Sequence, residues 1–262
     1  MQTELLVKVI LCLVPSVLVG GLAYWFYVQP SLSLQASRKA VIDRALSFMN
    51  EFLWNASIGS YRECPVLSEA PCAMNYWKED NYLAYVFNTE YTVNRTKATR
   101  IHEQLANENF SYYDRWIALS NYSANYTMYP CSTCRPTTPY QDDWYADHVA
   151  LDGIYDWKVG STVKAQDRLD FIIGHMLDAR LGLLRDNATD SEGFVYYKLA
   201  LALILATELK NSAYVTKFSE TLASQQNPDG SWLTGPAKPG GVFPNTESTI
   251  LDIIALKLAW NL

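Results

Sequence analysis

Helical stretches of two kinds alternate along this chain, and the alternation constrains the fold more than any other feature of the sequence. In the first kind, apolar residues recur at every third or fourth position, as in Arg38–Leu53, and form one stripe. In the second kind, as in Gly193–Leu209, almost every residue is apolar, so protein has to cover the helix on most sides. The sequence therefore predicts outer helices with one wet face that alternate with buried inner helices.

The alternation repeats at roughly 45 to 60 residues, which indicates stacked helical hairpins. Each outer helix is followed by a turn that contains Gly or Asn and then an aromatic residue or leucine; these turns are residues 54–61, 107–112, 181–186 and 226–232. The predicted outer helices are 38–53, 94–106, 161–178 and 212–225, and the predicted inner helices are 76–90, 142–157, 193–209 and 248–260. We expect an all-α domain of about four helical hairpins.

The last of these units carries a family likeness. Gln225–Trp232 (QQNPDGSW), followed by Asn245–Leu256, resembles the repeat of the α/α-toroid proteins, which include terpenoid cyclases, prenyltransferases, six-hairpin glycosidases and polysaccharide lyases. The resemblance implies an α/α toroid-like array. Those families usually have more hairpins, so an incomplete ring, a small bundle and a barrel completed by a partner remain alternatives.

An uncharged run precedes the helical domain. Residues 9–28 carry no charged side chain over a length of about 20 residues, which is what a helix needs to cross a membrane, and the run ends in the aromatic segment Tyr24–Tyr27. It predicts a transmembrane anchor in contact with membrane lipid. A cleaved signal peptide is the alternative, although the run exceeds the ~7–15 residues of a usual signal core. The predicted organisation is a cytoplasmic tail of residues 1–8, the anchor 9–28, a tether 29–37 and the hairpin domain 38–262.

Acceptor sequences for N-linked glycans are more frequent than the roughly two that chance would give. They lie at Asn55, Asn94, Asn109, Asn121, Asn125 and Asn187. This excess predicts a glycosylated domain outside the cytosol, at the cell surface or in the lumen of the secretory pathway. The alternative is a set of Asn-rich loops without glycans.

Cysteine usage agrees with that compartment. Four cysteines lie outside the anchor, at Cys64, Cys72, Cys131 and Cys134, and an even number can pair completely as disulfides. Of the three possible connectivities, loop length favours pairing of nearest neighbours. A zinc site of four thiolates is disfavoured by the wide spacing of the first pair.

Several function classes are excluded or disfavoured. The net charge of −6 argues against nucleic-acid binding, and no P-loop, dinucleotide fingerprint or zinc-protease motif occurs. We therefore expect no cofactor and no metal. The string from Asp142 to Asp147 is one residue off the metal box of class I terpenoid synthases, which disfavours cyclase activity. The oligomeric state stays open.

Acidic residues stand at the predicted N-terminal end of each inner helix. In the carbohydrate-active toroids, the resemblance implies that these ends converge on the substrate cleft. Hydrolysis of a glycosidic bond requires two carboxyl groups about 5 to 9.5 Å apart. The catalytic candidates are Asp143, Asp147, His148, Glu192 and Glu247, and the candidates for glycan binding, mostly rings that could stack on sugars, are Trp77, Asp80, Trp144, Tyr145 and Tyr196.

Helix capping is the competing interpretation of these acids, because acidic and amide side chains at a first turn satisfy free N–H groups. In a helix that begins at residue 142, however, Asp147, His148 and Asp152 lie beyond the cap, so they either pair with basic residues, line a wet cavity or transfer protons. On the helix, Tyr145, His148, Asp152 and Asp156 share one face. The sequence predicts a glycan-binding glycoside hydrolase or polysaccharide lyase-like enzyme; the alternative is a noncatalytic surface protein for binding or assembly.

Overall fold

The computed structural model describes residues 29–65, 76–106, 145–186, 196–234 and 243–262. The chain divides into two compact units, Met1–Val41 and Ile42–Leu262. The described part of the first unit belongs to helix α2, Gln29–Phe48, so residues 29–37, for which the sequence predicts a tether, are helical. No helix in the described ranges is long and apolar enough to cross a membrane, and the predicted anchor 9–28 lies outside them.

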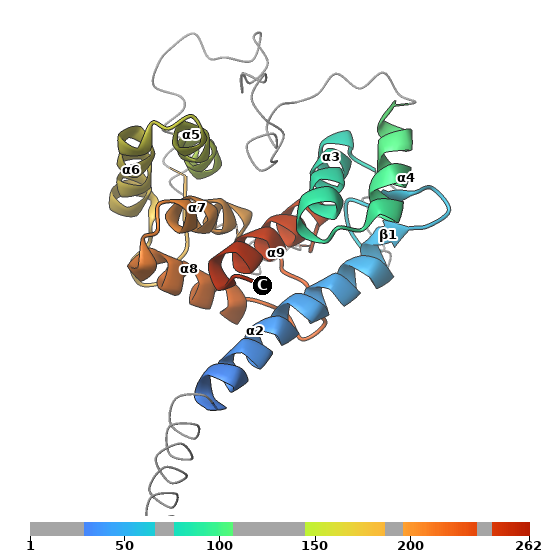
Figure 1. Ribbon diagram of the computed structural model, residues 1–262, viewed down its shortest axis with the longest axis horizontal. Coiled ribbons are helices and arrows are strands. Elements are labelled where there is room, and N and C mark those ends of the chain that lie inside the picture. Colours follow the sequence, from blue (N-terminus) through green and yellow to red (C-terminus); the bar gives the residue numbers. More distant parts are fainter. Residues whose placement is uncertain (1–28, 66–75, 107–144, 187–195, 235–242) are drawn as a thin grey trace, which may run out of the picture. The chain divides into compact units, whose positions relative to one another are not determined.

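The second unit is built from helices in pairs, as the hydrophobic periodicity predicts (Figure 1). The outer elements are α2 with the short π-helix η2 (Met49–Leu53), α4 (Arg95–Ala106), α6 (Thr162–Phe171) with η7 (Ile172–Met176), and α8 (Ser212–Ser224). The inner elements are α3 (Lys78–Val86) with η4 (Phe87–Tyr91), α5 (Ala146–Lys158), α7 (Tyr196–Glu208) and α9 (Thr246–Trp260). The predicted helix positions are confirmed, except that α5 begins at Ala146, later than expected; the predicted start of the inner helix 193–209 lies outside the described residues.

The inner helices form a row in the order α5, α7, α9, α3. The two helices in the middle, α7 and α9, pack against inner helices on both sides, and their residues are almost all buried. The two at the ends, α5 and α3, pack against one inner neighbour, α7 and α9 respectively, and against their outer partners α6 and α4 (Figure 1). This difference in cover explains why α7 and α9 are apolar all round whereas α3 and α5 carry polar faces.

Three equivalent turns follow the outer helices. Gly59, Gly182 and Gly230 each adopt a positive φ, of 81°, 69° and 93°, and two residues later a large side chain is buried: Tyr61, Leu184 and Trp232. In the first turn, β1 (Trp54–Asn55) pairs antiparallel with β2 (Ser60–Tyr61). The repeat predicted at the turns is thus confirmed in three copies, and the fourth turn, 107–112, lies outside the described residues.

Each of these turns caps an inner helix, in a cyclic order. The backbone N–H of Tyr196 in α7 donates to the carbonyl of Thr234, which follows α8, at 3.1 Å. The N–H of Ala146 in α5 donates to the Asp186 side chain, which follows α6, at 2.8 Å. The N–H of Thr246 in α9 donates to the carbonyl of Glu63, which follows α2, at 3.1 Å. The turns after α6 and α8 therefore each cap the inner helix that precedes them in the sequence, α5 and α7. The turn after α2 has no preceding inner helix and caps the last one, α9.

The C-terminal ends of the inner helices meet at a cavity of about 430 Å³. Its wall includes Tyr91 at the end of η4, Lys158 of α5, Glu208 of α7 and Lys257 of α9. The last turns of all four inner elements line one cavity, so these helices run in the same direction. Their N-terminal ends therefore lie together on the side of the row away from this cavity. That is the end where the sequence predicts the functional site.

Candidate functional site

The N-terminal end of α5 carries the predicted candidate Asp147. Since α5 begins at Ala146, Asp147 lies in the first helical turn, and the expectation that it lies too deep for that turn is wrong. The first N–H of the helix, that of Ala146, is bound by the Asp186 side chain. Asp147 is only 4% exposed, which requires a partner for its charge.

That partner is Lys198, in the first turn of α7. Its ammonium lies 3.5 Å from Oδ1 of Asp147 and 2.5 Å from Oδ2 of Asp186, and all three residues are buried. The Tyr197 hydroxyl donates a hydrogen bond of 3.2 Å to Oδ2 of Asp147. Both oxygens of Asp147 are thus held, one by a cation and one by a phenol, and such contacts favour the ionised carboxylate. Of the alternatives for Asp147, pairing with a basic residue of a neighbouring helix is confirmed.

Aromatic rings stand next to this cluster. Tyr145, directly before α5, is 39% exposed, and the Lys198 ammonium lies 5.7 Å from its ring centroid. The ring of His148, also exposed, lies 5.3 Å from that of Tyr145. Trp77 directly precedes α3, the inner helix at the other end of the row from α5, and is 56% exposed. At α5, the exposed ring of Tyr145 beside the buried carboxylate offers a stacking surface together with a hydrogen-bond acceptor.

Other predicted residues are arranged differently. Tyr196 is buried at 5% exposure, and its hydroxyl donates to Gln225, so its ring packs in the core and does not present an open face. The Asn245 side chain caps α9 by accepting from the Ser248 N–H, which confirms the capping interpretation there. Glu247 lies half-buried in the first turn of α9, and Asp80 is buried in the first turn of α3. Asp143, Trp144 and Glu192 lie outside the described residues.

Sequence reasoning missed three charged residues of this region: Lys198, Asp186 and Asp252. Lys198 and Asp252 are single charged residues inside the apolar helices α7 and α9, and a lone charge in such a helix is itself a signal, because it must be paired or neutral. Asp186 follows the turn at Gly182. At the equivalent positions of the other two turns, Glu63 and Thr234, it is the backbone carbonyl that caps an inner helix. The Asp186 side chain combines the capping role with the pairing of Lys198.

The surroundings of Asp252 favour its protonated form. Its side chain is fully buried, and neither carboxyl oxygen has a hydrogen-bond partner among the described residues; the same holds for the Ser248 hydroxyl one turn earlier. Burial raises the pKa of Asp252 well above its usual value. The pKa of Tyr196 is raised by its own burial and by the charge of Asp252. The two carboxyl groups therefore differ in the protonation state that their surroundings favour, which is ionised for Asp147 in α5 and protonated for Asp252 in α9.

The described part of the chain contains no cluster of three or more His, Cys, Asp or Glu side chains that could hold a metal ion. Cys64 is buried and disulfide-bonded. The other cysteines of the predicted pairs, Cys72, Cys131 and Cys134, lie outside the described ranges. Of the predicted glycan acceptors, Asn55 and Asn94 are described, and Asn109, Asn121, Asn125 and Asn187 are not.

No family model and no curated protein sequence matches the chain. Among solved structures, it is similar to the GH76A α-1,6-mannanase of Salegentibacter sp. HEL1_6, with 10% identity over 86% of this chain and 98% of that chain and a TM-score of 0.41. An inactive variant of that mannanase with two aspartates replaced by asparagine, in complex with α-1,6-mannotriose, gives 12% identity over 87% and 99% at a TM-score of 0.41. A second inactive variant, with alanines and in complex with α-1,6-mannotetrose, gives 11% identity over 86% and 99% at 0.43.

Proposed function

We propose that this chain is a membrane-anchored, glycosylated, extracytoplasmic enzyme that acts on glycans, with an α/α toroid-like domain whose site lies at the N-terminal ends of the inner helices. One observation carries the proposal: the buried carboxylate of Asp147 is held by Lys198 and Tyr197 next to the exposed ring of Tyr145. The reaction is hydrolysis of a glycosidic bond, or a lyase reaction on a polysaccharide.

The surroundings of Asp147 suit one half of an acid/base pair. Contact with the Lys198 ammonium and the Tyr197 hydroxyl favours the ionised form, which is the form that a base or a stabiliser of positive charge requires. Asp143, four residues earlier in the sequence and outside the described residues, is the candidate for the second carboxyl group. Tyr145 and Trp77 supply rings for stacking on sugars.

A noncatalytic binding protein is the second candidate, and one observation favours it. Both oxygens of Asp147 are already engaged, and Lys198 bridges to Asp186, so the three side chains form a buried ion cluster that could serve stability alone. In that case the exposed rings would still bind glycans, without turnover. The two candidates therefore differ in whether replacement of Asp147 changes a reaction or only the stability.

The test is release of reducing ends by the full-length chain in detergent, from α-1,6-linked mannan and from a panel of other polysaccharides. We expect Asp143→Asn and Asp147→Asn each to lower kcat by at least ~100-fold, the scale of general acid/base catalysis. Asp170→Asn, at an exposed position of α6, is the matched control. Thermal unfolding of each variant separates lost chemistry from lost folding. Unchanged turnover in both site variants would overturn the assignment of the site.

The lyase and hydrolase versions give different products. A lyase leaves an unsaturated sugar that absorbs in the ultraviolet, whereas a hydrolase leaves a saturated reducing end. Glycan binding by both site variants and by the natural chain, with no turnover of any substrate in the panel, would favour the noncatalytic candidate. The anchor and the orientation are tested separately, by membrane extraction and by glycan occupancy at Asn121 and Asn125.

A further inference from the structure

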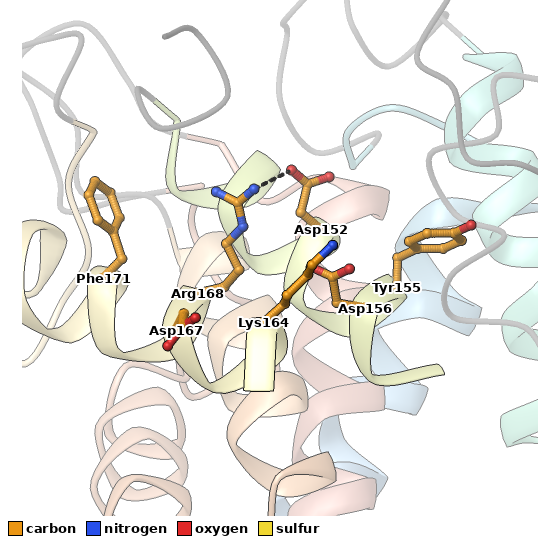
Figure 2. Close-up of a pocket in the computed structure, with 7 residues that line it drawn as sticks. All are labelled: Asp152, Tyr155, Asp156, Lys164, Asp167, Arg168 and Phe171. Carbon is orange, nitrogen blue, oxygen red and sulfur yellow. Dashed lines mark ion pairs between the residues drawn. The ribbon is translucent and has the colours of Figure 1, made fainter. Parts of the chain in front are cut away.

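A second concave surface lies between α5 and α6 (Figure 2). It is a groove with a volume of about 510 Å³, open to solvent along the pair of helices. The residues that line it are Asp152, Tyr155 and Asp156 from α5 and Lys164, Asp167, Arg168 and Phe171 from α6. We call it the α5/α6 groove.

Helix packing places these side chains at the surface. Gly153 faces the partner helices: a Cβ atom there would lie 2.6 Å from a methyl group of Leu205 in α7 and 3.2 Å from Cβ of Arg168 in α6. This close approach fixes the buried side of α5. The groove residues Asp152 and Asp156, which are four residues apart and share a face of the helix, are each only half-buried.

The polar groups of the groove suit a ligand that both donates and accepts hydrogen bonds. Arg168 points toward Asp152 in Figure 2, with 3.8 Å between guanidinium nitrogen and carboxylate oxygen, and both side chains are about a third exposed or more. A guanidinium has five N–H donors and a carboxylate about four acceptor positions, so the groove presents groups of both kinds. The lining has three acidic and two basic residues, a net charge of −1.

Rings lie at both ends of this polar stretch. In the view of Figure 2, Phe171 and Tyr155 flank the charged side chains on opposite sides. A small net charge, a mixture of hydrogen-bond donors and acceptors, and two flanking rings together favour a neutral, polyhydroxylated ligand over a nucleotide, a peptide of strong charge or a metal ion. This is the chemistry of a saccharide.

The α5/α6 groove and the proposed site at Asp147 and Tyr145 lie along the same helix, α5. Tyr145, His148, Asp152 and Asp156 fall on one face of α5, and the first two rings are in contact at 5.3 Å. From Tyr145 to Asp156 the rise along the helix is about 16 Å, the length of a short oligosaccharide, at 1.5 Å per residue. A chain that contacts Tyr145 at one end can therefore reach the groove with the other.

We propose that the α5/α6 groove is a remote glycan-binding site, which holds the distal part of a long glycan chain whose other end lies at Asp147 and Tyr145. This inference rests on the proposed function, and it adds that the substrate is a chain of several sugar units. It predicts that affinity rises with chain length, because only a long chain spans both places.

The experiment measures binding as a function of chain length. Calorimetry on the full-length chain in detergent uses α-1,6-manno-, cello- and chito-oligosaccharides, each as a disaccharide and a hexasaccharide. We expect one series to bind, with the hexasaccharide tighter. Arg168→Gln and Phe171→Leu remove the guanidinium and the ring at nearly constant volume, and each should reduce the hexasaccharide preference by about five- to tenfold.

Controls and outcomes keep the two proposals apart. Arg95→Gln in α4 and Val163→Ala in α6 change exposed residues outside the groove and should keep the preference. If the groove variants keep it as well, or if the natural chain binds both lengths equally, the groove proposal is wrong while the site at Asp147 stands. If no series binds and no substrate is turned over, the proposed function is wrong, and the groove proposal fails with it.

Discussion

The Lys198 ammonium of α7 lies 3.5 Å from the Asp147 carboxylate of α5, and each of these side chains is only 6% exposed. This contact joins the N-terminal ends of two inner helices. Desolvation of both charges is costly, and their mutual attraction offsets that cost only while the pair is complete. The same ammonium also binds Asp186, so its loss affects two carboxylates at once.

Lys198→Met is therefore expected to lower the free energy of unfolding by about 3–5 kcal/mol, since it leaves two buried carboxylates without their cation. Chemical denaturation measures this change. Lys210→Met, at an exposed position, should change stability by less than ~0.5 kcal/mol. Adding Asp147→Asn to Lys198→Met should restore part of the loss, and a double variant that is no better than the single one would contradict the pairing.

The glycine turns provide a second matched comparison. A Cβ atom at Gly230 would lie 2.3 Å from the carbonyl oxygen of Arg44, and the residue has a φ of 93°. At Gly160 the φ is 83° and nothing lies within 4 Å of the added atom. Gly160→Ala should thus cost only the strain of a left-handed residue, about 1–2 kcal/mol. Gly230→Ala adds a backbone clash of about 1–3 kcal/mol or more, which unfolding curves of the two variants can resolve.

Asp252 predicts a dependence of stability on pH. The folded state keeps a proton that the unfolded chain releases above the ordinary pKa of about 4, so stability falls as pH rises from there toward the raised native pKa. Asp252→Asn removes the titration, and its melting temperature relative to the natural chain should rise between pH 5 and pH 8. Asp170→Asn serves as the control. An equal slope in all three proteins would show that Asp252 is ionised in the fold.

Glycan occupancy should differ between the two described acceptors. The Asn55 amide is half-buried and donates a hydrogen bond of 2.7 Å to the Tyr76 hydroxyl, while its oxygen accepts from Ser57. Asn94 is exposed directly before α4 and accepts from the Lys97 N–H. Mass spectrometry of the protein from a secretory host should find higher occupancy at Asn94. Tyr76→Phe frees the Asn55 amide and should raise occupancy at that position.

Periodicity alone predicts the helices well, and for a physical reason. A helix with one dry face has a stripe of apolar residues, and α7 and α9, which are covered on both sides, are apolar all round. Helix starts are less visible: Asp142 and Asp143 look like a first turn, yet the helix begins at Ala146, because the cap comes from Asp186, 40 residues away. A cap supplied across the fold leaves no local signal.

Residue pairing is the part that the sequence does not reveal. Asp147 and Asp152 are conspicuous in the sequence, and an ion pair with a basic residue is one of three roles that it allows for them. Their partners, Lys198 and Arg168, come from other helices. Choosing among pairing, a wet cavity and proton transfer requires knowing which helices are neighbours. The order α5, α7, α9, α3, in which the last inner helix of the sequence, α9, packs beside the first, α3, is a property of the packed row and not of any one segment.

The contact of the turn after α2 with α9 also bears on how such a chain can change length. Because each turn caps the helix one step back, and Glu63 caps the last inner helix, removing hairpins from the C-terminal end would leave the first turn without its partner. Insertion of a hairpin between α4 and α5 would leave all three described caps in place. The capping order therefore links the first turn of the second unit to its last inner helix, so α9 depends on a segment that precedes it by about 180 residues.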